Sequence, residues 1–151
     1  MAFPPKRILV ATDFSSSSKK AADLAVELAR TYGATVSVTH VLPLSHAMAS
    51  TLSLHDNRHE VFAFERSLRR HADQALEAEI ERLHSSGVEV TAQLLEGPTS
   101  PTICEASRDA DLVVIATNGR TGFSRLALGS VTESVVRASH APVLTVRADA
   151  H

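Results

Sequence analysis

Cysteine, tryptophan and long hydrophobic runs are scarce or absent in this 151-residue chain, which has one cysteine, no tryptophan and 4% aromatic residues. Cys104 has no partner for an internal disulfide, which fits a reducing cytoplasm. A formal net charge of −2 and the lack of any Lys/Arg run argue against bulk attraction to nucleic acid or anionic lipid. No apolar run is long enough to span a membrane, and the N-terminal residues lack the apolar core of a signal peptide. We therefore expect a soluble cytoplasmic protein that binds neither nucleic acid nor a membrane, with residues 1–151 forming one domain.

What the sequence does contain is an alternation of strand-sized apolar runs with amphipathic runs, the pattern of βαβ units and a parallel sheet. The apolar runs predict strands at 7–12, 34–41, 88–94, 112–116 and 142–146, with helices between them. Right-handed crossovers then give a three-layer, doubly wound α/β fold with a parallel five-stranded sheet in the order 3-2-1-4-5. The winding direction reverses between the first and fourth strands, and such folds bind ligands beyond the carboxyl ends of the strands at that point.

Local signals indicate where the helices begin and end. Ser17 is among the N-cap candidates in the serine run after the first strand, and Gly33 stands where a left-handed residue would end the first helix. Pro101 suits the first turn of the third helix, after a cap at Thr99 or Ser100.

Side-chain patterns also predict packing. The strand at 88–94 alternates apolar and polar residues, so we expect it to be half-exposed at a sheet edge. Cys104 is expected to be a small core residue of the third helix, not a nucleophile. Phe62 and Phe64 are expected to be packing residues of the long second helix, with Phe64 on its apolar face.

Residues 42–58 interrupt the regular pattern with Pro, Ser, His and Ala, and we expect a long excursion there. His55 and His59 are four residues apart and would share a helix face if the helix began that early. A metal site is the alternative to solvated loop histidines, and the lack of an accompanying cysteine favours the solvated histidines.

The connection from the strand at 112–116 to a helix capped at Ser130 is the strongest candidate for a binding site. It contains Gly119, Gly122 and Gly129, and glycine lets the backbone approach a ligand closely. The N-terminus of the following helix favours an anion such as phosphate. Asp13, after the first strand, would lie at the same switch point. An ordinary βα connection, with glycines that only permit turns, is the alternative.

Several segments together resemble the universal stress protein family, in its ATP-binding branch. They are Ile8 to Ser15, His40-Val41, Gly119 followed after nine residues by Gly129-Ser130, and Ala141 to Val146. The resemblance implies a winding like that of flavodoxin and of adenine nucleotide alpha hydrolases. In the family's nucleotide motif a glycine occupies the position of Ala116, so an extra methyl near the sugar and phosphates is expected to weaken or retune binding.

The resemblance also implies a set of nucleotide-binding residues at the switch point. Ala11 and Thr12 would contact the base, and Val41 would line the adenine pocket. Asp13 would accept hydrogen bonds from the ribose hydroxyls or from the adenine side. The residues expected to bind the sugar and phosphates are Ala116, Thr117, Asn118, Gly119, Arg120, Gly129, Ser130, Val131 and Thr132. Mg²⁺ or Mn²⁺ would bridge the phosphates.

The implied function is that of a stress-response regulatory protein that binds ATP and hydrolyses it slowly at most. A homodimer through the last strand, Val143–Val146, is implied, and a protein partner is unidentified. We expect nucleotide occupancy to change residues 42–58 or the loop after Gly119. AMP or a cyclic nucleotide stays open as the ligand. Two other functions stay open: a nucleotide-free dimeric interaction module, and a slow ATP hydrolase or adenylyl-type transferase.

Overall fold

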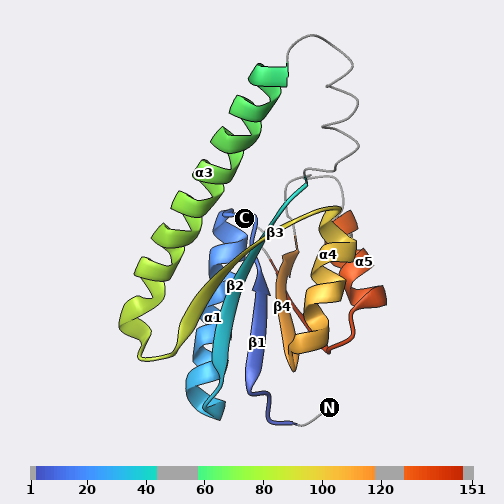
Figure 1. Ribbon diagram of the computed structural model, residues 1–151. Coiled ribbons are helices and arrows are strands. Elements are labelled where there is room, and N and C mark those ends of the chain that lie inside the picture. Colours follow the sequence, from blue (N-terminus) through green and yellow to red (C-terminus); the bar gives the residue numbers. More distant parts are fainter. Residues whose placement is uncertain (1–2, 44–57, 118–127, 148–151) are drawn as a thin grey trace.

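The computed structural model describes residues 3–43, 58–117 and 128–147 (Figure 1). Its sheet contains β1 (Arg7–Ala11), β2 (Thr35–Leu42), β3 (Val90–Glu96), β4 (Leu112–Thr117) and β5 (Val143–Arg147). The strands are parallel and follow the order β3-β2-β1-β4-β5, which confirms the predicted topology. β3 is an edge strand with mostly exposed residues, also as predicted.

The helices form one layer on each face of the sheet (Figure 1). They are α1 (Ser16–Tyr32), α3 (Arg58–Leu83), α4 (Thr99–Ala106) and α5 (Ser130–Ala138), with short 3₁₀ turns at His84–Ser86 and Ser107–Asp109. α1 and α3 cover one face, and α4 and α5 cover the other. The protein is therefore a three-layer, doubly wound α/β fold.

Alternation along the strands divides the core into two clusters, because successive side chains of a strand point to opposite faces. On β4, Val114 and Ala116 pack in the cluster under α1 and α3, whereas Val113 and Ile115 pack under α4 and α5. β1 divides in the same way, with Ala11 in the cluster under α4 and α5. This division decides which side chains can reach a ligand at either face.

The structure corrects three of the predicted helix starts. Ser15, not Ser17, is the N-cap of α1, and its hydroxyl accepts the N–H of Ser18. α4 begins directly after Pro98 without a side-chain cap, so neither Thr99 nor Ser100 caps it. α5 begins directly after Gly129, so Ser130 is its first residue and not its cap. Gly33 ends α1 in the left-handed conformation, as predicted.

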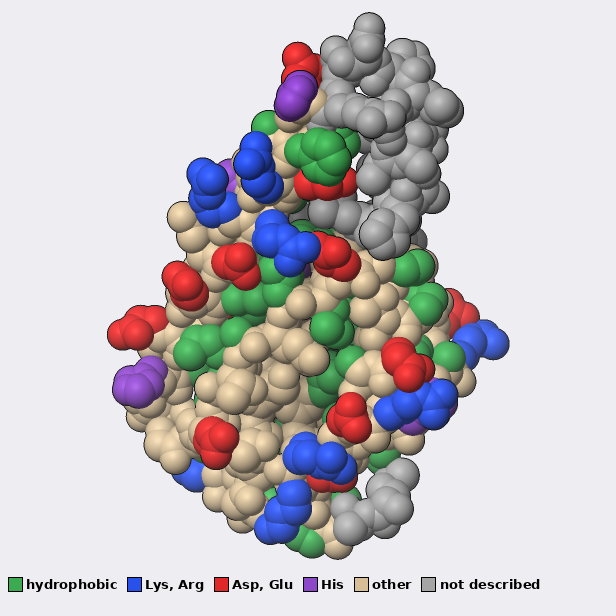
Figure 2. Space-filling model, in the orientation of Figure 1, with side chains coloured by type: hydrophobic (Ala, Val, Ile, Leu, Met, Phe, Trp, Pro, Cys, Tyr) green, Lys and Arg blue, Asp and Glu red, His purple; other side chains and the backbone are tan. Residues whose placement is uncertain are grey.

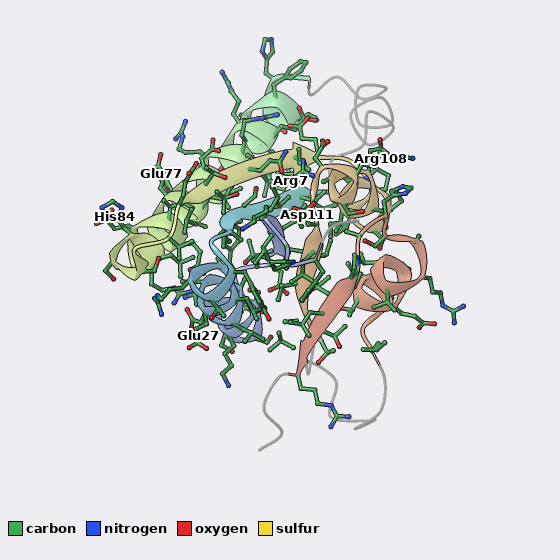
Figure 3. The ribbon with its side chains drawn as sticks, turned by 90° about the horizontal axis from the view of Figure 1, so that it is seen from below. Arg7, Glu27, Glu77, His84, Arg108 and Asp111 are labelled. Atoms are coloured by element: carbon green, nitrogen blue, oxygen red, sulfur yellow. The ribbon has the colours of Figure 1, made fainter. Side chains whose placement is uncertain are left out.

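Asp111 ties the start of β1 to the start of β4 at the amino end of the sheet. Its Oδ2 accepts the backbone N–H groups of Lys6 (3.0 Å) and Arg7 (2.9 Å), and its Oδ1 accepts the Arg7 guanidinium (3.1 Å). Figure 3 shows the two side chains facing one another in the view from below. The bond from the Arg7 side chain, helped by the two backbone bonds, holds the pKa of Asp111 below its ordinary value despite some desolvation.

The N-terminal turns of α3 extend past the end of the sheet (Figure 1). Phe62 and Phe64 lie on these turns and are 57% and 59% exposed, so the expected core packing of both rings is wrong. Cys104 is buried as predicted, and burial raises the pKa of its thiol. Among the helices described, none is both long enough and apolar enough to cross a membrane.

Candidate functional site: a pocket at the switch point

A pocket of about 250 Å³ lies at the carboxyl ends of β1, β2 and β4. Its apolar wall comes from the strands and from the two helices on the α4–α5 face: Ala11, Val41, Ile103, Ile115 and Val131. Its polar lining consists of Thr12, Asp13, Ser18, Thr39, His40, Thr99 and Thr132, and Pro43 and Ala116 complete it. The pocket therefore lies where the winding reverses, as the sequence predicts.

Hydrogen bonds fix the loop between β1 and α1 that carries Asp13. Thr12 Oγ1 donates to Ser18 Oγ (3.1 Å) and accepts the N–H of Phe14 (3.0 Å). Asp13 Oδ1 accepts the N–H of Ser15 at 3.0 Å, which closes a short side-chain turn. Partial burial alone would raise the pKa of Asp13, but hydrogen bonds from Ser15 and Ser18 outweigh it and hold the pKa below its ordinary value. Asp13 is therefore an ionised acceptor at neutral pH, suited to bind hydroxyl or N–H groups of a ligand.

His40 holds the same loop from the neighbouring strand. Its Nδ1 lies 2.7 Å from the backbone oxygen of Thr12, and because a carbonyl can only accept, Nδ1 carries the proton. The imidazole also lies against the ring of Phe14, with the centroids 4.5 Å apart. Phe14 has a φ of 64°, a left-handed conformation that costs a non-glycine residue about 1–3 kcal/mol unless its surroundings impose it. The bonds to Thr12 and the contact with His40 impose it here.

The N-terminus of α5 borders the pocket on the β4 side. The N–H of Glu133 bonds to the Gly129 carbonyl, and no side chain caps the preceding turn. The N–H groups of Ser130, Val131 and Thr132 precede the first intrahelical bond and are the donors that a helix start offers to an anion. The buried Thr132 hydroxyl donates to the Ala116 carbonyl (3.0 Å), so its only proton is already used. Thr132 therefore offers a ligand its backbone N–H.

The methyl group of Ala116 lies on the sheet face opposite the apolar wall of the pocket. Ala116 follows Ile115 on β4, and its side chain belongs to the opposite cluster, under α1, where it is 7% exposed. The apolar wall of the pocket lies on the other face, and Thr12 and Ser18 line the pocket from the α1 side. Strand alternation therefore argues against the expectation that this methyl crowds a sugar and phosphates, and that expectation stays a prediction for a binding measurement.

The structure brings together only part of the residue set that the sequence predicts. Ala11, Thr12, Asp13, Val41, Ala116, Val131 and Thr132 line the pocket. Thr117 turns toward β5, where its hydroxyl donates to the Val146 carbonyl (3.4 Å). Gly129 and Ser130 are at the start of α5 and do not line the pocket. Asn118, Gly119 and Arg120 lie outside the described residues, as do His55 and most of the excursion at 42–58.

Sequence reasoning missed half of the lining: Ser18, Thr39, His40, Pro43, Thr99, Ile103 and Ile115. Strand alternation was an available signal for Thr39 and Ile115, because each lies two residues from a predicted residue of its own strand, Val41 and Thr117, and therefore shares its sheet face. Thr99 and Ile103 are four residues apart and share a face of α4. His40 gave no such signal, since its ring bonds to the backbone oxygen of Thr12, in the loop after β1.

The charged groups of the pocket limit its chemistry. Asp13 is the only carboxylate in the described lining, and no Lys or Arg belongs to that lining. The described residues contain no cluster of His, Cys, Asp and Glu that could hold a metal ion, and His59 is exposed on α3. One carboxylate does not form a Mg²⁺ site by itself, because Mg²⁺ in proteins is held by carboxylates together with ligand phosphates. The described lining therefore fits an uncharged, partly apolar group with a few hydrogen-bonding positions.

Fold and site together define a doubly wound α/β protein with a small-molecule pocket at its switch point. The sequence model of the universal stress protein family matches residues 4–147, and this chain belongs to that family.

Two relatives illustrate the similarity. A universal stress protein of Thermus aquaticus is 34% identical over 145 residues, covering 94% of this chain and 98% of that protein. Another, from Methanocaldococcus jannaschii, is 31% identical over 144 residues, covering 94% of this chain and 82% of that protein.

Several solved structures share the fold. The structure of the hypothetical protein MJ0577 has a TM-score of 0.78 at 24% identity and covers 97% of this chain and 98% of its own. A universal stress protein of Archaeoglobus fulgidus in complex with dAMP has a TM-score of 0.66 at 23% identity, and the match covers 93% of this chain and 96% of that chain. A family member from Arabidopsis thaliana with AMP bound has a TM-score of 0.69 at 20% identity, with 97% and 94% covered. A further universal stress protein was solved in complex with cAMP, with a TM-score of 0.63 at 23% identity and 94% and 96% covered.

Proposed function

We propose that this chain binds an adenine nucleotide at the switch point, with ATP as the regulatory ligand, in the reducing cytoplasm that its single cysteine fits. The observation that carries the proposal is one pocket that combines an apolar wall, an ionised acceptor at Asp13 and the donor end of a helix. The bound AMP, dAMP and cAMP of family members support the same ligand class.

In this proposal the base and sugar occupy the described pocket. Ala11, Val41 and Ile115 supply apolar contacts for a planar base, and Asp13 accepts hydrogen bonds from the ribose hydroxyls. Thr12 borders the base edge while its hydroxyl stays in the loop network. A volume of about 250 Å³ is at the small end of ligand pockets, which fits a nucleoside better than a larger cofactor.

The phosphates are assigned to the start of α5 and to the segment before it. The N–H groups of Ser130, Val131 and Thr132 and the backbone of Gly129 are the described donors. Thr117, Asn118, Gly119 and Arg120 complete the proposed phosphate site. Mg²⁺ or Mn²⁺ would arrive with the phosphates, since the described lining lacks a metal site of its own.

A homodimer through Val143–Val146 is part of the proposal. β5 is the edge strand next to β4, and its residues are only half-buried in the single chain. Pairing of two such edges would cover them. Sedimentation of the parent and of a Leu144→Lys variant tests this: the parent should be a dimer and the variant a monomer, and a monomeric parent would refute it.

Binding without rapid turnover is the expected behaviour. Asp13 would have to act as a base without a second carboxylate, and the Nδ1 of His40 is committed to Thr12. Measuring phosphate release in the presence of Mg²⁺ tests this expectation: the nucleotide should stay bound without rapid hydrolysis. Steady release of product that is abolished by Asp13→Ala would instead favour the enzymatic alternative.

The decisive experiment is calorimetric titration with AMP, ADP, ATP and cAMP, each with and without Mg²⁺. Asp13→Asn keeps an oxygen for the Ser15 N–H but loses the charge, and should weaken binding by about tenfold or more. Asp109→Asn is the matched control, because it makes the same change at the other end of the sheet. Absence of binding by the folded parent would refute the proposed function and leave the nucleotide-free interaction module.

A further inference from the structure

A second hollow lies far from the switch point, between α3 and the free edge of β3. The groove measures about 580 Å³, and Leu76, Ile80, Ala92 and Leu94 form its apolar floor. Three carboxylates from α3 form its rim: Asp73, Glu77 and Glu81. Figure 2 shows hydrophobic side chains beside acidic ones along this flank.

The backbone of β3 offers unpaired hydrogen-bonding groups along the groove. The Glu89 carbonyl accepts from Val36 and the Gly97 N–H donates to Leu42, so the odd-numbered residues of this segment bond to β2. Because N–H and C=O groups alternate in direction along a strand, those of Ala92 and Leu94 point away from β2. β3 is the terminal strand of the described sheet, so its outer side is available to an added strand.

The three carboxylates of the rim are regularly spaced along α3 and repel one another. Asp73, Glu77 and Glu81 recur every four residues, which is about 6 Å along a helix. Like charges at this spacing destabilise a helix slightly, and none of the three forms an ion pair with another described residue. Figure 3 shows Glu77 on the outer flank of α3. The groove therefore presents uncompensated negative charge over an apolar floor.

A second copy of this chain does not fit the groove. Residues of β3 on the groove side are Val90, Ala92, Leu94 and Glu96, which bring no positive charge. Pairing two β3 edges would also bring two acidic rims together. β5, the other edge strand, has a single basic residue, Arg147.

We propose that the groove binds an extended segment of a partner protein, added as a strand beside β3, with Lys or Arg at alternate positions. Alternate side chains of a strand are about 6.6 Å apart, close to the 6 Å spacing of the carboxylates. Their alkyl stems would cover Leu76, Ile80 and Leu94, and their charged ends would reach the rim. Backbone bonds to Ala92 and Leu94 would supply the affinity that is independent of charge.

The test uses a peptide as long as β3 (7 residues), with alternating lysine and threonine, titrated into the full chain by calorimetry. A peptide with the same residues in two blocks is the sequence control. We expect binding by the alternating peptide alone, weakened when salt rises from about 0.01 M to about 1 M, which shortens the screening length from about 30 Å to about 3 Å.

Two variants separate charge from backbone pairing. Asp73→Asn, Glu77→Gln and Glu81→Gln together should weaken binding about tenfold, while Asp109→Asn, Glu27→Gln and Glu60→Gln together, with the same loss of charge, should not. Ala92→Pro removes an outward N–H without touching the ladder to β2, and should abolish binding. Urea unfolding of each variant checks that it is folded. No binding by the alternating peptide, equal binding by the block peptide, undiminished binding by the acidic triple variant, or binding that survives Ala92→Pro would overturn the proposal.

Discussion

Replacing Ala116 by glycine separates two interpretations of the most visible departure from the family's nucleotide motif. If the methyl crowded the ligand, Ala116→Gly would restore the motif and strengthen binding. The structure places the methyl under α1, in a buried cluster on the far side of the sheet from the pocket wall. We therefore expect Ala116→Gly to change nucleotide affinity by less than about twofold, within the spread of substitutions that do not touch a ligand.

The same substitution should lower stability. A buried CH₂-sized group contributes about 0.8 kcal/mol, and glycine in a strand costs a further 0.5–1 kcal/mol or so relative to alanine. The expected loss is about 1.5 kcal/mol, which corresponds to a Tm lower by about 3–6 °C for a chain of this size. Urea unfolding and calorimetric melting of the ligand-free protein measure it.

Ala11→Gly is the matched control, because Ala11 is exposed to the same extent (7%) but packs on the pocket side of the sheet. It should lose similar stability and also weaken nucleotide binding by about fourfold, since in the proposed complex its methyl would contact the ligand. An Ala116→Gly variant that keeps its stability and binds severalfold more tightly would refute the reasoning from strand alternation.

Two further predictions concern hydrogen bonds at the two ends of the sheet, made by His40 at the carboxyl end and by Asp111 at the amino end. His40→Leu leaves the Thr12 carbonyl without its donor and should lower the free energy of unfolding by about 1–3 kcal/mol, whereas His40→Asn, whose amide can occupy the Nδ1 position, should recover much of the loss. Equal urea midpoints for the two variants would contradict the assigned tautomer. Asp111→Asn should cost about 1 kcal/mol at pH 7. Because the folded pKa of Asp111 is depressed, its stabilisation is present above the unfolded pKa of about 3.9 and is lost as the pH falls through the folded value. The stability difference between parent and variant, measured from pH 7 to pH 3, should therefore shrink in acid, and a constant difference would contradict it.

The topology was predictable because five apolar runs separated by amphipathic runs leave few ways to wind a parallel sheet. The helix caps were less predictable, because several serines with the same propensity stand side by side before α1 and only the chain's path selects Ser15. Phe62 and Phe64 show another limit. The spacing of Phe64 continues the apolar face of α3, but nothing in that spacing reveals that the sheet ends before the helix does.

Part of the pocket required information that no local pattern carries. β4 is apolar at nearly every position because both of its faces are buried, so its sequence does not show which residues belong to which face. That assignment comes from the neighbours: α4 and α5 pack on Val113 and Ile115, and α1 packs on Val114 and Ala116.

Whether a departure from a motif disables a site therefore depends on the direction of one side chain and not on its distance from the ligand. At Ala116 the backbone carbonyl accepts the bond from Thr132 that holds the start of α5, and such a carbonyl is available to any residue. A glycine would be required there only if the methyl pointed toward α5, or if φ were positive. Ala116 is not among the non-glycine residues with positive φ, and its methyl points toward α1. The alanine is consequently compatible with a working site, and the loss of the family's first glycine gives no reason to regard the pocket as decayed.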